Sequence, residues 1–318
     1  LNCAAFIYVS LYSCNLLVEK SRLTSSPFKQ RICSVEFHVF VLVLLAAAMH
    51  ATWNALIKID GDRFTVVCWL AIVQSTIVLL VAPFLEMPSG IVWFWIILSG
   101  ALHAAYKIFL SQAYQHGDLS QVYPLARGTA PLLTTLVAFL FLSEKLPTLT
   151  VLGILVIGFG IISMAFKGGQ PGQTLQTKTI ILALCTSLLI TAYTTVDGYG
   201  ARLAVSPHSF FVYMHLVDGV IMISAMILFR RKTAISVFGQ EWKRCTMGGF
   251  FSVGAYWIAI WAMTKAPIAA VAALRETSVL IAVIIGVVFM KEKLTVWRCA
   301  AVALILLGVV LLRVGSQT

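Results

Sequence analysis

Charged residues are scarce in this sequence. Asp, Glu, Lys and Arg make up 11% of its 318 residues and 60% are hydrophobic, whereas a soluble chain has about 25% charged residues. Apolar runs of about twenty residues recur from Phe37 to Val314, and each is long enough to cross a hydrocarbon layer of ~30 Å. Because these runs are continuous rather than alternating, they exclude membrane-spanning strands and predict an all-α membrane protein.

The sequence also lacks the cysteine and histidine patterns of metal sites and enzymes. Its seven cysteines are scattered and contain no CxxC pair, so neither a disulfide framework nor a zinc site is indicated. No HExxH motif, nucleophile–base pair or acidic cluster is present. We therefore expect no enzymatic activity, no metal and no cofactor.

Acidic residues are few as well: 12 Asp and Glu stand against 23 Lys and Arg, a net charge of +11. The basic residues lie mainly between the apolar runs, which fits loops beside anionic lipid headgroups better than nucleic-acid binding. The expected partners are thus the lipid bilayer, a small-molecule substrate and, as an option, protons. The oligomeric state stays open between monomer and homodimer.

What the sequence does contain is an internal repeat. The segment from Gln121 to Lys145 resembles the segment from Ala269 to Lys293, and a shift of 148 positions places Arg127 on Arg275. The match continues without a gap over about forty residues, which indicates two copies of one unit.

Ten spans are expected, at 37–57, 64–85, 91–113, 120–142, 149–166, 179–198, 208–229, 246–264, 267–290 and 296–314. The chain divides into a leader, 1–36, expected to lie outside the fold; a first five-helix repeat, 37–166; a linker, 167–178; and a second five-helix repeat, 179–318. An eleventh helix in the leader is the alternative. An odd number of spans per copy inverts the second relative to the first, as in secondary transporters.

The charges between spans bear on orientation. Without the leader, four Lys or Arg flank the spans on the amino-terminal side and twelve on the other. The positive-inside rule then places both ends of the repeat unit outside. Counting the leader's four basic residues weakens this assignment.

Polar side chains at helical spacing mark six of the spans. They are His50, Trp53 and Asn54; His103, Lys107, Ser111 and Tyr114; Ser120, Tyr123, Arg127 and Thr134; Thr194 and Asp197; His215 and Asp218; and Arg275 and Glu276. In lipid such stripes must face one another or a wet cavity. The list contains three cations and three carboxylates, which could also pair with one another without any ligand: Lys107, Arg127, Arg275, Asp197, Asp218 and Glu276.

The two arginines stand out by symmetry. Arg127 lies about eight residues and Arg275 about nine residues into its span, hence ~12 Å deep at 1.5 Å per residue. Inverted repeats bring both to the midplane, where two forked donors suit a carboxylate or phosphate. The alternative is that Arg275 pairs with a carboxylate and joins two helices. The expected substrate-binding residues are Arg127, Arg275, Tyr123, Asn54, Trp53, His103, Lys107 and Trp257.

Glu276 and Asp197 are the candidates for proton coupling, because burial near a cavity favours the protonated form of a carboxylate. Neighbours on a helix point ~100° apart, so Glu276 is poorly placed to pair with Arg275. We expect it to meet Lys107 or Arg127 across the cavity instead.

These motifs resemble the EamA-domain type of the drug/metabolite transporter (DMT) superfamily. The resemblance covers about 37–314 and rests on the duplicated layout, on HATWNALIK (His50–Lys58), on GDLSQVYPLARGTAPLL (Gly117–Leu133), and on ALRETSVLIAVIIG (Ala273–Gly286) with the following KEKL. The family's usual Gly-Glu pair is Ser143-Glu144 and Lys291-Glu292 here.

The resemblance implies a secondary transporter, commonly an exporter of amino acids or other small metabolites, in the plasma membrane (the inner membrane of a bacterium). It also implies a cavity lined by helices one, three, four, six, eight and nine. Two other functions compete: proton-coupled efflux of lipophilic or cationic compounds, with Glu276 and tryptophans as binding groups, and a membrane scaffold that transports nothing.

Overall fold

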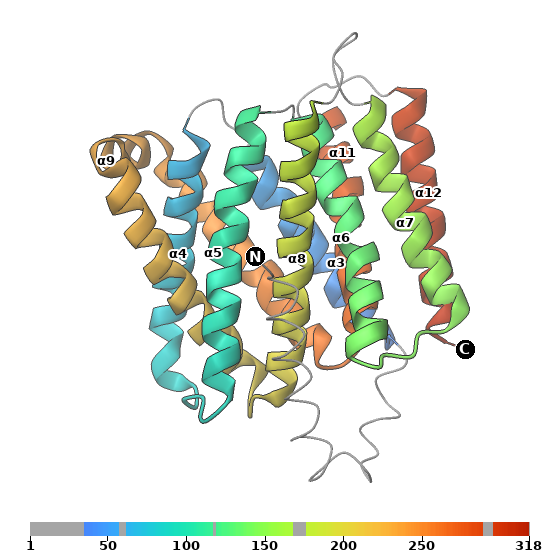
Figure 1. Ribbon diagram of the computed structural model, residues 1–318, viewed down its shortest axis with the longest axis horizontal. Helices are drawn as coiled ribbons and strands as arrows, with labels where there is room; N and C mark the ends of the chain where they lie inside the picture. Colours follow the sequence, from blue (N-terminus) through green and yellow to red (C-terminus); the bar gives the residue numbers. More distant parts are fainter. Residues whose placement is uncertain (1–34, 57–61, 117–118, 168–175, 289–294, 318) are drawn as a thin grey trace.

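The computed structural model describes residues 35–56, 62–116, 119–167, 176–288 and 295–317, so the expected leader lies almost wholly outside the described residues. The described chain forms α-helices and one short 3₁₀ helix, η1, and contains no strand. The elements are α3 (Phe37–Leu56), α4 (Arg63–Val81), η1 (Ala82–Phe84), α5 (Val92–His116), α6 (Leu119–Phe141), α7 (Thr148–Lys167), α8 (Thr177–Leu203), α9 (Pro207–Met263), α10 (Ile268–Arg275), α11 (Ser278–Val288) and α12 (Val296–Gly315). They stand side by side as a bundle (Figure 1).

The described residues contain nine stretches long and apolar enough to cross a membrane, and α9 alone makes two crossings. At 57 residues α9 is far longer than one crossing needs. Its backbone leaves helical geometry at Arg230, with φ −137° and ψ 18°. The expected spans 208–229 and 246–264 are therefore its first and second arms, and the ten-span prediction is confirmed. Figure 1 shows one arm rising, the helix turning near its label, and the other arm descending.

The ninth span, expected over 267–290, is present as a crossing, but it is not one continuous helix. It is divided into α10 and α11 at Glu276 and Thr277. The amides of Glu276, Thr277, Val279 and Leu280 all bond to the carbonyl three residues earlier, which is 3₁₀ rather than α geometry. The Thr277 hydroxyl also donates to the Leu274 carbonyl at 2.7 Å. Such a tight turn inside a span commonly marks a hinge.

The two repeats meet at α7 and α12, and small residues let the backbones touch. A Cβ atom on Gly153 would lie 2.6 Å from the Gly308 oxygen, and one on Gly160 would lie 3.4 Å from the Ala301 oxygen. The repeat offset of 148 positions places Gly153 on Ala301 and Gly160 on Gly308. The contact of Gly153 with Gly308 and that of Gly160 with Ala301 are therefore equivalent under the symmetry of the two repeats. Lower numbers on α7 meet higher numbers on α12. The helices are antiparallel, as inverted repeats require.

Local chemistry also sets the start of α4. Asp62 caps it by accepting the Thr65 amide at 3.2 Å, which satisfies one of the donors that a helix start leaves open. The other oxygen of Asp62 accepts from Nε of Arg230 at 3.1 Å. The cap of α4 is thereby joined to the point where α9 turns.

At the opposite end of the bundle an ion pair joins the repeats. Glu144 follows α6, and its Oε1 lies 2.9 Å from Nη2 of Arg202 at the end of α8. The same oxygen accepts the Ile268 amide, the first of α10, at 3.1 Å. Arg202 also donates to the carbonyls of Met263 and Ala266. This inter-repeat ion pair holds the α9–α10 connection against the first repeat.

Candidate functional site

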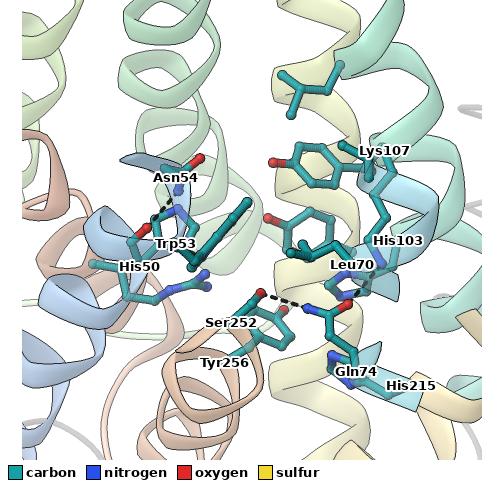
Figure 2. A pocket seen from close by; sticks show the side chains of 15 residues that line it. His50, Trp53, Asn54, Leu70, Gln74, His103, Lys107, His215, Ser252 and Tyr256 are labelled. Atoms are coloured by element: carbon teal, nitrogen blue, oxygen red, sulfur yellow. Dashed lines mark hydrogen bonds between the residues drawn. The ribbon is translucent and has the colours of Figure 1, made fainter. Parts of the chain in front are cut away.

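A cavity of about 90 Å³ lies inside the bundle. Its lining comes from α3, α4, α5, α8, both arms of α9, and α10. The lining residues are His50, Trp53, Asn54, Val67, Leu70, Gln74, His103, Tyr106, Lys107, Leu110, Tyr193, His215, Ser252, Tyr256 and Arg275. Figure 2 shows His50, Trp53 and Asn54 on one side, and His103 and Lys107 on the other. Ionisable and aromatic side chains from both repeats therefore surround one space.

Arg127 lies at the α3 side of the site and belongs to a buried ion pair. Its Nε is 3.0 Å from Oε2 of Glu276, and both side chains are at most 5% exposed. The expectation that Glu276 would meet Arg127 or Lys107 is confirmed. The pair links α6 of the first repeat to the break between α10 and α11 in the second.

Arg127 also approaches His50, with 3.0 Å between its Nη2 and Nε2 of the imidazole. The Trp53 indole donates to the other nitrogen of the same ring, Nδ1, at 3.1 Å. Arginine and tryptophan side chains only donate hydrogen bonds, and a neutral imidazole accepts at one nitrogen only. His50 can therefore satisfy either Trp53 or Arg127 at one time, but not both.

Asp197 is the centre of a second polar cluster. It accepts short hydrogen bonds from the hydroxyls of Ser99 and Tyr256, and its Oδ2 lies 2.9 Å from Nε2 of His103. The carboxylate is completely buried, so these partners replace the water it has lost. Asp197 thus joins α8 to α5 and to the second arm of α9.

Arg275 sits at the last residue of α10 and faces the cavity. Its guanidinium carbon lies 4.7 Å from the centroid of the Tyr256 ring, a cation–π contact. The side chain of Arg275 makes no ion pair or hydrogen bond with any residue in the described part of the chain. Its five N–H donors are therefore not used by the protein's own described side chains.

Lys107 forms a third cluster with Asp218 on the first arm of α9, through a short ion pair. Lys107 also donates to Gln74 Oε1 at 3.4 Å, and the Gln74 amide donates to the Ser252 hydroxyl at 2.7 Å. This chain of contacts crosses from α5 through α4 to the second arm of α9, and Figure 2 shows its Gln74–Ser252 link.

The six buried charges of the site sum to zero if all are ionised: Lys107, Arg127 and Arg275 against Asp197, Asp218 and Glu276. This set of residues therefore carries no surplus positive charge when all six are ionised. What distinguishes Arg275 is its geometry, because the other two cations each have a carboxylate in contact.

The structure places the residues expected to bind substrate in two groups. Arg275, Asn54, Trp53, His103 and Lys107 line the cavity. Arg127, Tyr123 and Trp257 lie outside the described lining. The helices expected from the resemblance are also partly different, since α6 supplies no described lining residue, whereas α4 supplies Val67, Leu70 and Gln74.

Trp257 belongs to an aromatic cluster of its own. Its indole donates to Nδ1 of His208 at 2.7 Å and stacks on Phe211 at 4.7 Å between ring centroids. Both partners lie at the start of α9, so Trp257 holds the two arms of α9 together beside the cavity.

Sequence reasoning missed several lining residues, among them Gln74, Ser252, Tyr256 and Tyr193. Gln74 is the only side-chain amide in its span, which was a usable signal. Ser252 and Tyr256 are four residues apart, one helical turn, and so share a face.

The family model of the EamA-like transporter family matches residues 39–166 and residues 177–314. The chain belongs to this family. The two EamA matches coincide with the two copies of the internal repeat, and EamA-like proteins are membrane transporters of the DMT superfamily. No curated protein matches the sequence. A crystal structure of another protein has the same fold, with a TM-score of 0.69 and 17% identity over 88% of this chain and 96% of that chain. This EamA protein is thus a multi-pass membrane protein with two repeats.

Proposed function

We propose that this protein exports a small solute that carries a carboxylate or phosphate group, such as an amino acid, by alternating access around the cavity. The observation that carries the proposal is Arg275. Its guanidinium is buried, lies at the break of a membrane-spanning helix, faces the cavity and has no described carboxylate partner. Burying an unpaired charge is costly, so an anionic ligand would stabilise this site.

The surroundings of Arg275 support a direct ion contact. The guanidinium presents paired donors that match the two oxygens of a carboxylate or phosphate. The Tyr256 ring lies against the guanidinium, with 4.7 Å between the guanidinium carbon and the ring centroid. The other cavity cation, Lys107, is occupied by Asp218. We therefore propose Arg275 as the primary contact, with Asn54, Trp53 and His103 completing the wall.

Alternating access requires an element with two arrangements. We propose the 3₁₀ turn at Glu276 and Thr277 as this element, because α10 and α11 are separate helices within one span. Divided spans near the midplane are typical of substrate sites in secondary transporters. The cavity volume of about 90 Å³, far below the roughly 300–1,000 Å³ of a drug-sized site, favours a small metabolite over a lipophilic drug.

We also propose that Glu276 binds the coupling proton, with Asp197 second. Protonation of Glu276 would neutralise it and remove the attraction to Arg127 at 3.0 Å. This would change the charge beside the α10–α11 break, linking a proton to the conformation of the site. No step of this cycle changes a covalent bond of the solute, so we propose no enzymatic activity.

The test for the anion contact is solute binding by Arg275 variants. Purified protein in liposomes is first screened for flux of amino acids and small phosphorylated and carboxylated metabolites. Calorimetry then compares the wild type with Arg275→Ala and Arg275→Lys. Loss of a hydrogen bond to a charged group costs ~1.5–3 kcal/mol, so we expect affinity to fall about ten- to a hundred-fold. Arg275→Lys keeps the charge but loses the fork and should be nearly as impaired.

The matched control is Arg244→Lys, the same change at an exposed arginine whose described contact is Glu241. It should bind the solute like the wild type. Equal affinity in wild type and both Arg275 variants would show that Arg275 is structural. Flux of a hydrophobic cation but of no anion would favour the drug-efflux alternative, and no flux of any solute would favour a scaffold.

The proton role is tested with Glu276→Gln, which removes the titrating group at nearly constant volume. We expect flux driven by a pH gradient to be lost while exchange of labelled for unlabelled solute continues. Glu36→Gln, at an exposed carboxylate before α3, is the control and should retain both. Unchanged pH-driven flux in Glu276→Gln would rule out the coupling role of Glu276.

A further inference from the structure

The middle of α9, residues 231–245, crosses between the two arms of the helix. We name this segment the cross-helix. In Figure 1 it appears nearly end-on beside the α9 label, whereas the spans run from top to bottom. It begins where Arg230 departs from helical geometry. The cross-helix therefore runs across the end of the bundle and not through it.

One face of the cross-helix is fixed to the protein. Ala234 and Cys245 are buried. The Trp69 indole on α4 donates to the Ala234 carbonyl at 2.9 Å and stacks on Phe238 at 4.1 Å between ring centroids. The rotation of the cross-helix about its own axis is thus set by α4.

The neighbouring face is apolar and exposed. Ile235 is 81% exposed and Trp242 is 49% exposed. At ~100° per residue, both side chains point about a quarter-turn away from the face that docks on α4. Exposure of these two large apolar side chains to water would be unfavourable, whereas the boundary between headgroups and acyl chains would bury them.

Basic residues border this apolar stripe. Arg231, Lys232 and Lys243 are exposed, and none of them has an acidic partner among the described residues. Lys232 and Lys243 fall on the flank beyond Ile235, by the same helical spacing. The Lys243 ammonium lies 5.7 Å from the Trp242 ring centroid, which places a cation directly beside the apolar stripe.

We propose that the cross-helix is a binding site for anionic phospholipid headgroups, with Lys232 and Lys243 on the phosphates and Ile235 and Trp242 in the acyl boundary. The order of faces (protein, apolar stripe, basic flank) is that of a helix lying in a membrane interface. Anionic lipid is richest in the cytoplasmic leaflet. The cross-helix therefore belongs to the cytoplasmic side of this protein.

The test is energy transfer from tryptophan to dansyl-labelled phosphatidylglycerol, titrated into full-length protein in neutral detergent micelles. Each lysine near an anionic surface contributes ~1 kcal/mol, which is about five-fold in affinity. We expect Lys232→Gln/Lys243→Gln to raise the half-saturating lipid concentration about 25-fold, and added salt to weaken wild-type binding more than binding by this variant. Trp242→Leu would lose part of the donor signal, so the apolar stripe is tested with Ile235→Ser, which should weaken binding at every salt concentration.

The matched control is Lys145→Gln/Lys265→Gln, which removes two exposed lysines from the opposite end of the bundle. It should bind the labelled lipid like the wild type. An equal shift in both double variants would show only general charge attraction and would overturn the proposal. Displacement of the lipid by millimolar inorganic phosphate as complete as that by unlabelled phosphatidylglycerol would instead indicate a free-phosphate site, and would also overturn it.

Discussion

Lys107 and Asp218 illustrate how single residues carry the polar interior of this bundle. Their ion pair joins α5 to the first arm of α9, with side-chain exposures of 10% and 1%. Removing one partner from a buried pair leaves an uncompensated charge, which costs about 3–5 kcal/mol, whereas replacing both with apolar residues is often neutral. The effect of one substitution therefore depends on whether its partner is still present.

We expect Lys107→Met to destabilise the protein by about 3–5 kcal/mol, because Asp218 would be left charged and unpaired. Lys107→Met/Asp218→Leu should recover most of that loss, although Gln74 would lose its contact with the ammonium. Thermal denaturation of the wild type and of the single and double variants in detergent checks this by comparing their stabilities. A double variant no more stable than Lys107→Met would show that the two side chains do not interact.

At the scale of the helix, the close contact between α7 and α12 depends on the absence of side chains. The amide nitrogen of Leu312 and the oxygen of Gly308 would each lie 2.6 Å from a Cβ atom at position 153. Both are backbone atoms, which cannot rotate away as a flexible side chain would. The two helices would have to separate to admit even a methyl group, and packing is what drives association of helices in lipid.

Gly153→Ala should therefore lower the thermal denaturation midpoint, by an amount typical of overpacking, ~1–3 kcal/mol. Gly239→Ala in the cross-helix is the matched control, because nothing lies within 4 Å of its added Cβ atom. That control should be neutral or stabilise by up to roughly 1 kcal/mol, as alanine is the better helix former. Equal midpoints for the two variants would contradict the tight crossing.

The arrangement of the ten crossings makes a prediction for the whole molecule. α7 ends at Lys167 and α8 begins at Thr177 on the same side of the bundle as the cross-helix (Figure 1). Single cysteines placed in a cysteine-free background at positions 172 and 236 should react with a membrane-impermeant reagent from the same side. Cysteines at 145 and 265 should react from the opposite side. Labelling of positions 172 and 236 from opposite sides of the membrane would contradict the ten-span topology.

Much of this architecture could be predicted from the sequence, because lipid demands long apolar helices and the repeat is visible as a fixed offset. The pairing of Glu276 away from Arg275 also followed from helix geometry alone. The division of the ninth span could not be predicted, since neither proline nor glycine interrupts Arg275–Ser278. The break lies where the backbone hydrogen bonds change to a spacing of three residues.

The site itself was predicted less completely, for a reason that lies in helix rotation. Tyr256 and Trp257 are adjacent on one helix, yet Tyr256 faces the cavity and Trp257 faces His208. Where a helix is apolar all round, its sequence does not indicate which side faces the centre. Only the neighbouring helices decide this, and they come from distant parts of the chain.

The crossing of α7 and α12 has a consequence for a half-length chain. Gly153 and Gly160 on α7 occupy the same places as Ala301 and Gly308 on α12, so each helix presents the surface that its counterpart needs. A protein made of the first repeat alone would carry a self-complementary patch and could assemble as an isologous dimer. Gly153 of one copy would then meet Gly160 of a second copy in the opposite membrane orientation. The α7–α12 contact joins two halves of one chain here. Two separate subunits inserted in opposite orientations could form the same contact.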